Sequence, residues 1–171
     1  MKPYLSADGR HFRAPWSRSL RWATLLGCAV LLGLAVTVCV TAPAKDLIPK
    51  VITAATAVLL IGATALFTIR GYRLEGRELL VDRLLWSTRI PLDDLHAAEV
   101  APDAMRRSIR LWGNGGLFAF AGWFRNRWLG TYRAFATDPA RSVVLRFPNR
   151  RIVVTPDDPQ RFAEVLESRH G

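Results

Sequence analysis

The pattern of hydrophobic and polar positions divides the chain into two parts. Residues 22–44 and 51–69 contain no charged side chain, so every Lys, Arg, Asp and Glu lies outside these two runs. As a helix rising 1.5 Å per residue, each run is long enough to cross a hydrocarbon core of about 30 Å. In lipid, an open chain satisfies its backbone hydrogen bonds only as a helix. The pattern predicts transmembrane spans over residues 22–42 and 51–69, joined into a hairpin by a short loop.

The distribution of basic residues predicts the orientation of this hairpin. Basic residues crowd the two ends that lie outside the loop: Lys2, Arg10, Arg13, Arg18, Arg21, Arg70, Arg73 and Arg77. The loop contains only Lys45 and Lys50, with Asp46 between them. Because basic flanks stay in the cytoplasm, we expect a multi-pass protein of the cell (inner) membrane, with a basic cytoplasmic leader at 1–21 and both termini cytoplasmic.

A cleaved secretory signal is the competing interpretation of the first run. Ala42-Pro43-Ala44 resembles a signal-peptidase site after a basic leader. The apolar run is longer than the 7 to 15 residues usual for a signal peptide, which favours a retained span. Cleavage would leave one span, so the two interpretations predict different topologies.

Residues 70–171 are patterned as short strands followed by a helix. Apolar and polar positions alternate in residues 84–92 and 142–154, as in antiparallel strands with one exposed face. The predicted strands are 72–74, 79–83, 86–92, 97–100, 108–112, 131–137, 143–147 and 151–155. Residues 155–159 (TPDDP) supply N-cap oxygens and first-turn prolines, and Phe162, Val165 and Leu166 then form one apolar stripe. The fold class is therefore α+β.

Several motifs in this part resemble the bacterial pleckstrin-homology-like (PH-like) domain family in its membrane-anchored form. They are residues 72–76 (YRLEG), 90–95 (IPLDDL), 110–118 (RLWGNGGLF), 129–138 (LGTYRAFATD) and 153–159 (VVTPDDP). The resemblance implies that residues 70–171 form a PH-like antiparallel β-barrel or sandwich, capped by one C-terminal helix. PH domains that bind phosphoinositides use basic residues at the first hairpin loop. Here that loop is Glu75-Gly76, and Arg73 and Arg77 flank it.

The most unusual segment is Leu111–Phe124, in which no residue is charged although five are aromatic. Arg125, Arg127 and Trp128 follow directly. One interpretation is a buried hairpin of the β-domain. The other is a lipid- or partner-facing surface, because a Trp ring suits the membrane boundary and a guanidinium suits lipid phosphate. Six residues are therefore candidates to face lipid or a partner: Trp123, Arg125, Arg127, Trp128, Arg73 and Arg77.

The sequence contains no recognisable catalytic, cofactor-binding or metal-binding set. Residues 113–116 (GNGG) lack the Lys-Ser/Thr of a P-loop, so we expect a β-turn there. Asp93, Asp94 and His96 have no second cluster of metal ligands in the sequence, and we expect solvated turn residues. Cys28 and Cys39 fall in the first span and fit small packing residues. We expect no enzyme activity and no cofactor.

Charge separates the remaining functional classes. The whole chain has a net charge of +10. Residues 70–171 contain 17 arginines, no lysine and 12 acidic residues, a net charge of +5 (17 − 12). Interspersed acidic residues disfavour the alternative of a membrane-tethered nucleic-acid binder. The sequence favours a non-enzymatic interaction or scaffolding module with an unidentified protein partner and anionic phospholipid headgroups within reach. An accessory subunit of a membrane transporter or enzyme complex stays open as an alternative.

Overall fold

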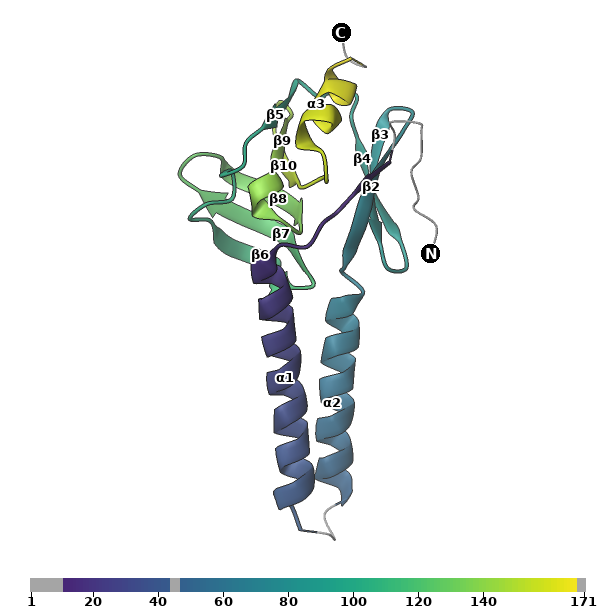
Figure 1. Ribbon diagram of the computed structural model, residues 1–171, viewed down its shortest axis with the longest axis vertical. Coiled ribbons are helices and arrows are strands. Elements are labelled where there is room, and N and C mark those ends of the chain that lie inside the picture. The colour runs from purple at the N-terminus through teal and green to yellow at the C-terminus, as the bar shows by residue number, and fades with distance from the viewer. Residues whose placement is uncertain (1–10, 44–46, 169–171) are drawn as a thin grey trace.

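The computed structural model describes residues 11–43 and 47–168. Two long helices, α1 (Arg18–Thr41) and α2 (Leu47–Ala65), stand side by side below a β-rich domain (Figure 1). Both are long and apolar enough to cross a membrane, and within their most apolar windows only 11% and 6% of residues are buried. Helices this exposed are unlike the core helix of a water-soluble domain. The predicted helical hairpin is present. Residues 1–10 of the predicted leader and 44–46 of its loop lie outside the described residues.

The helix ends differ from the ends of the apolar runs. Ser17 caps α1 by accepting a hydrogen bond from the backbone N–H of Leu20 (3.1 Å), so the helix begins four residues before Trp22. Helix α2 begins at Leu47, because Pro49 is tolerated in a first turn. It ends at Ala65 rather than at residue 69, since Ile69 is fully buried and starts a strand. The apolar run 51–69 thus includes one residue of the β-domain core.

The β-domain consists of two sheets that do not close into a barrel. One sheet has the strand order β1-β2-β3-β4 and the other β5-β9-β10-β8-β7-β6, and no ladder joins them among the described residues. The first contains β1 (His11–Arg13), β2 (Ile69–Glu75), β3 (Glu78–Arg83) and β4 (Ser87–Pro91). The second contains β5 (Ala97–Val100), β6 (Ile109–Leu117), β7 (Ala119–Asn126), β8 (Gly130–Ala136), β9 (Val143–Arg146) and β10 (Arg151–Val154). A short 3-10 turn, η1 (Pro139–Arg141), precedes β9. The fold is therefore the sandwich form of the predicted architecture, with one departure from the predicted antiparallel pairing: β10 pairs with β8 in parallel.

Helix α3 (Pro159–Glu167) covers the end of the sandwich farthest from α1 and α2 (Figure 1). Asp158 caps it by accepting from the backbone N–H of Arg161 (3.1 Å), as the TPDDP motif predicts. Its residues Phe162 and Leu166 are fully buried in the core between the sheets. A second, smaller core lies on the outer face of the larger sheet, where Ala101 and Ala104 of the loop after β5 cover Tyr132.

Strand β1 corrects the division of the chain into a leader and a domain. Residues 11–13 fall within the predicted leader, yet they pair antiparallel with β2, and Phe12 is in register with Tyr72. Phe12 is 4% exposed, and its ring meets that of Phe162 edge to face at 4.9 Å. The β-domain is therefore assembled from residues on both sides of the helical hairpin.

The glycine-rich segment 113–116 is not a turn but part of β6, whose turn to β7 falls at Leu117 and Phe118. Gly113 faces Gly122 across the two strands, with φ of 104° and 153°. A Cβ at Gly122 would lie 2.1 Å from the carbonyl oxygen of Trp112, so only glycine permits this approach. The glycines allow two irregular strands to pair.

Candidate functional site

The end of the β-domain nearest the helices exposes two groups of large apolar side chains. The β3–β4 turn contributes Leu84, Leu85 and Trp86, which are 38%, 74% and 41% exposed. Strand β6 contributes Ile109, Leu111 and Trp112, which are 72%, 52% and 79% exposed. The first group lies beside the end of α2, and β6 lies beside the start of α1 (Figure 1). We call these six residues the basal surface.

Direct contacts place the β3–β4 turn beside the segment that follows α2, and the β6–β7 turn beside α1. On the α2 side, the rings of Phe67 and Trp86 meet edge to face at 5.7 Å. Arg83 donates to the carbonyl oxygen of Phe67 (3.2 Å), and its guanidinium lies over the Phe67 and Trp86 rings. Burial, followed by the nearby charge of Arg133, lowers the pKa of Arg83, although an arginine stays charged in proteins.

On the α1 side, the β6–β7 turn rests on the first helical turns. The backbone N–H of Phe118 donates to the hydroxyl of Thr24 (3.0 Å). The Phe118 ring meets that of Trp16 edge to face at 6.0 Å. Leu117 lies so close to Gly27 that a Cβ on this glycine would be 2.8 Å from its methyl group. The edge strand β6 is therefore held at the level where α1 leaves the β-domain.

A basic groove opens at the other end of the β6–β7 hairpin. Its lining residues come from the loop after β5, the start of β6, the end of β7, the β7–β8 turn and the start of β8: Asp103, Arg106, Arg107, Ile109, Arg125, Asn126, Arg127, Trp128 and Gly130. Its volume is about 1140 Å³. The four arginines are exposed, and none forms an ion pair with a carboxylate in the part of the chain that the structure describes. We call this concavity the arginine groove.

Asn126 ties the two loops that form the arginine groove. Its side-chain amide donates to the carbonyl oxygen of Ala104 (2.8 Å) and to the hydroxyl of Ser108 (3.0 Å). Its side-chain oxygen accepts from the backbone N–H groups of Trp128 (3.1 Å) and Leu129 (2.6 Å). Loops cross-linked in this way present their side chains with little loss of conformational freedom on binding.

The six candidate residues predicted from the sequence fall into two groups in the structure. Arg125, Arg127 and Trp128 line the arginine groove, and Trp123, 43% exposed, precedes them on β7. The other two candidates belong to the smaller sheet and have carboxylate partners.

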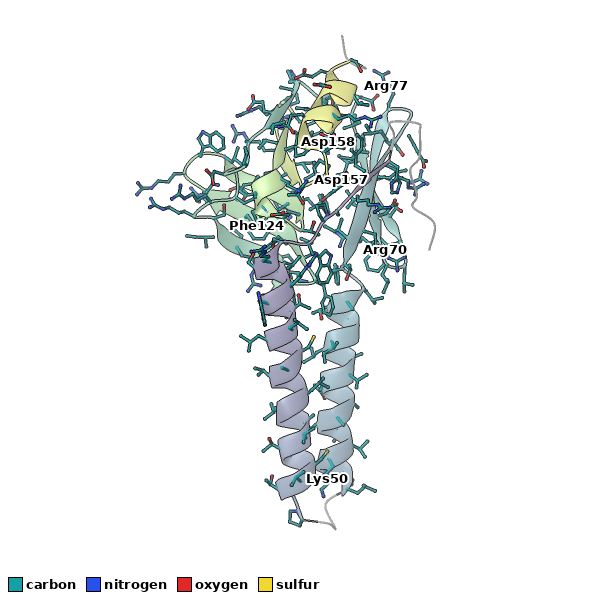
Figure 2. The ribbon with its side chains drawn as sticks, in the orientation of Figure 1. Lys50, Arg70, Arg77, Phe124, Asp157 and Asp158 are labelled. Carbon is teal, nitrogen blue, oxygen red and sulfur yellow. The ribbon has the colours of Figure 1, made fainter. Side chains whose placement is uncertain are left out.

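Arg73 donates to Asp82 through Nε (2.7 Å) and Nη2 (2.9 Å) and through Nη1 to Glu75 (2.7 Å). Partial burial of Asp82 opposes its ionisation, but hydrogen bonds from Arg73 and Ser87 outweigh this effect and lower its pKa. Arg77 lies 3.0 Å from Asp93 at the end of the domain farthest from the helices, whereas Arg70 lies beside them (Figure 2). The geometry therefore gives Arg73 and Arg77 structural partners instead of a shared site with the β7–β8 turn.

The sequence patterns did not identify most residues of the basal surface or two of the four arginines of the arginine groove. Leu84 and Leu85 fell between two predicted strands and Trp86 at the start of the second, and the three residues form an exposed turn. Arg106 and Arg107 showed no pattern, because only the packing of Ala104 on the larger sheet brings their loop to the β7–β8 turn. The segment 111–124 combines both interpretations: β6 is exposed, while Ala119, Ala121 and Phe124 of β7 are buried. Asp93, Asp94 and His96 lie between β4 and β5.

The two-sheet sandwich with one helix across its end defines a PH-like domain. The family model described as Bacterial PH domain matches residues 70–170, and the chain belongs to this family. The match begins after α2, so β1 is an addition to it from the N-terminal side of the hairpin. Comparison with curated proteins and with solved structures gives no match. PH domains are generally non-catalytic interaction modules, and two exposed apolar helices suggest that this one is associated with a membrane.

Proposed function

We propose that this protein is a membrane-anchored, non-enzymatic interaction module whose PH-like domain rests on anionic phospholipid headgroups. The observation that carries the proposal is the position of the basal surface on both sides of the helical hairpin. Exposed Trp and Leu side chains are costly in water but suit the boundary between headgroups and acyl chains. If α1 and α2 span the bilayer, both groups meet that boundary together.

The lengths and flanking charges of the helices support this arrangement. Lys50 lies near the far end of α2, and Arg70 lies just past its near end (Figure 2). Twenty helical residues cover about 30 Å, the thickness of a hydrocarbon core. The β-domain end of the hairpin carries Arg18, Arg21 and Arg70, which favours the cytoplasmic side for the domain and for both termini.

The charge on the β-domain supports an anionic lipid surface as the contact. Within a Debye length of about 8 Å, each arginine near such a surface contributes on the order of 1 kcal/mol. The exposed arginines of the β6–β8 region adjoin the apolar side chains of β6, so ring and guanidinium can bind the same interface. A domain held in this way can offer its outer surface to a protein partner.

Hydrogen exchange of the full chain in nanodiscs tests this function. We expect the backbone amides of 84–86 and 109–112 to exchange more slowly in nanodiscs containing phosphatidylglycerol than in phosphatidylcholine nanodiscs at low salt. The difference should shrink at high salt, because headgroup attraction is screened. The β2–β3 turn, at the opposite end of the domain, is the internal control and should not respond. Equal exchange of the basal segments in both lipids would contradict the proposal.

A further inference from the structure

The arginine groove differs from a general positive surface in charge and shape. Four arginines and one aspartate give the lining a charge of +3 (4 − 1). By contrast, Arg73, Arg77 and Arg146 elsewhere in the β-domain are each joined to a carboxylate. An unneutralised cluster of guanidinium groups is typical of phosphate recognition, because each guanidinium can donate two parallel hydrogen bonds.

The size of the groove indicates more than one phosphate group. The volume of about 1140 Å³ is larger than the roughly 300 to 1,000 Å³ of typical ligand pockets. The arginines come in two pairs, Arg106 with Arg107 on the loop after β5 and Arg125 with Arg127 at the end of β7. Asn126 holds the two loops together through its bonds to Ala104 and Trp128. Two pairs of arginines on loops that are hydrogen-bonded to each other can bind two phosphates held at a fixed separation.

The apolar part of the lining indicates that the phosphates belong to a lipid. Ile109 and Trp128 line the groove and are 72% and 61% exposed. Ile109 also belongs to the basal surface, and the same strand continues through Leu111 and Trp112 toward α1. The groove is therefore continuous with the basal surface, which in the proposed function contacts the bilayer. A soluble phosphate would make no favourable contact with these apolar side chains, whereas a lipid would.

We infer that the arginine groove is a binding site for the headgroup of a lipid that carries two phosphates, with one phosphate at each arginine pair and the glycerol or acyl stems along Ile109 and Trp128. This inference rests on the proposed membrane contact, since the groove reaches lipid only if the basal surface does. Asn126 is a positioning residue, because it holds both pairs in place without donating to the phosphates.

The test uses the full chain in mild detergent, with bound lipids counted by native mass spectrometry. We expect cardiolipin, which has two phosphates, to bind about tenfold more tightly than phosphatidylglycerol, which has one. The double variants Arg106→Gln/Arg107→Gln and Arg125→Gln/Arg127→Gln should each remove most of this preference. The matched control Arg89→Gln/Arg161→Gln loses the same charge from exposed positions outside the groove, together with the exposed ion pair of Arg89 with Glu78 (3.7 Å), and should retain the preference. All these arginines are exposed, so folding is preserved.

Three outcomes would overturn the inference: no preference for cardiolipin, an equal loss in the control variant, or saturation of the groove by inorganic pyrophosphate with the same affinity as cardiolipin. The last outcome would assign the groove to a soluble phosphate ligand. The groove variants should retain the slow exchange of residues 84–86 in anionic nanodiscs. Absence of a cardiolipin preference in the unaltered protein, with that protection intact, would therefore overturn the groove site alone, whereas absence of the protection in the unaltered protein would overturn the proposed membrane contact.

Discussion

The backbone N–H of Phe118 donates a 3.0 Å hydrogen bond to the hydroxyl of Thr24 on α1, so the β6–β7 turn and this long apolar helix share a polar contact. Thr24 is 6% exposed although it lies in an apolar helix. Leu117 packs beside it on Gly27. This contact holds the β6–β7 turn against α1, at the level of the proposed lipid surface.

Gly27→Leu should separate the β6–β7 turn from α1. A Cβ at this position would lie 2.8 Å from a methyl group of Leu117, so Leu117 must move to admit any side chain there, and the longer leucine side chain should displace it from α1. We expect a cost of about 1–3 kcal/mol, as for overpacking elsewhere, measured by thermal unfolding in detergent. Gly33→Leu is the matched control, because nothing lies within 4 Å of a Cβ there. Equal stability of the two variants would contradict the contact.

Phe12→Ala should destabilise the β-domain even though residue 12 precedes the helical hairpin. Its ring is 4% exposed and packs on Phe162, and the loss of a buried Phe ring costs about 3–5 kcal/mol. His11→Ala, at an exposed position of the same strand, is the control. A fragment that starts at residue 70 should likewise be less stable than the full chain in chemical denaturation. A fragment of undiminished stability would show that β1 is not part of the fold.

Tyr72→Phe should weaken the link between the two sheets. The Tyr72 hydroxyl donates to the carbonyl oxygen of Phe135 (2.6 Å) and accepts from the backbone N–H of Thr155 (3.1 Å). Both backbone groups lose their partner in the variant, at a cost of about 1–3 kcal/mol.

Burial raises the pKa of Tyr72 from 10.0 to about 12, despite opposing hydrogen bonds with Thr155. A raised pKa in the folded state means that the contribution of Tyr72 is complete below pH 10 and is lost as pH rises to about 12. Unfolding followed by circular dichroism should therefore show a smaller loss of stability between these pH values in Tyr72→Phe than in the unaltered protein. Parallel pH curves would contradict this assignment.

Asp82→Asn should reduce stability at neutral pH and leave lipid binding unchanged, because Arg73 serves the smaller sheet. Hydrogen bonds from Arg73 and Ser87 outweigh the effect of partial burial and hold the pKa of Asp82 below its ordinary value of 3.8. The ion pair therefore stabilises the fold above pH 3.8, and its contribution is lost as pH falls through the lower folded-state pKa. The variant should lack this acidic transition in urea unfolding. Weaker binding to anionic vesicles in Asp82→Asn would assign Arg73 a role at the lipid surface.

The sequence predicts the helices and strands of this fold better than it predicts which of them pair or pack together. Two charge-free runs suffice for α1 and α2, and alternation indicates β4, β9 and β10, because both signals are local. Strand β1 is too short to carry a pattern, and its position depends on pairing with β2 across the whole hairpin. Ile69 was assigned to a membrane span because a buried strand residue and a lipid-facing residue are equally apolar.

In the candidate site, too, residues close together in the sequence were predictable, whereas residues joined by long-range contacts were not. Trp123, Arg125, Arg127 and Trp128 are neighbours in the sequence and were found together. Arg73 and Arg77 look like a free basic pair in the sequence, since their carboxylate partners Asp82 and Asp93 come from other strands and turns. Arg106 and Arg107 join the groove only through the long-range packing of their loop on the larger sheet.

Depth-dependent quenching of tryptophan fluorescence by brominated lipids tests the membrane contact most directly. In full-length proteins that keep a single tryptophan, Trp86 and Trp112 should both be quenched by bromines placed near the headgroup end of the acyl chain. The control is a tryptophan-free protein with Arg77→Trp, at the opposite end of the domain, which should show no quenching (Figure 2). Quenching of both basal tryptophans, but not of the control, is the result expected from a domain that rests on the bilayer. Absence of quenching at Trp86 and Trp112 would contradict that account.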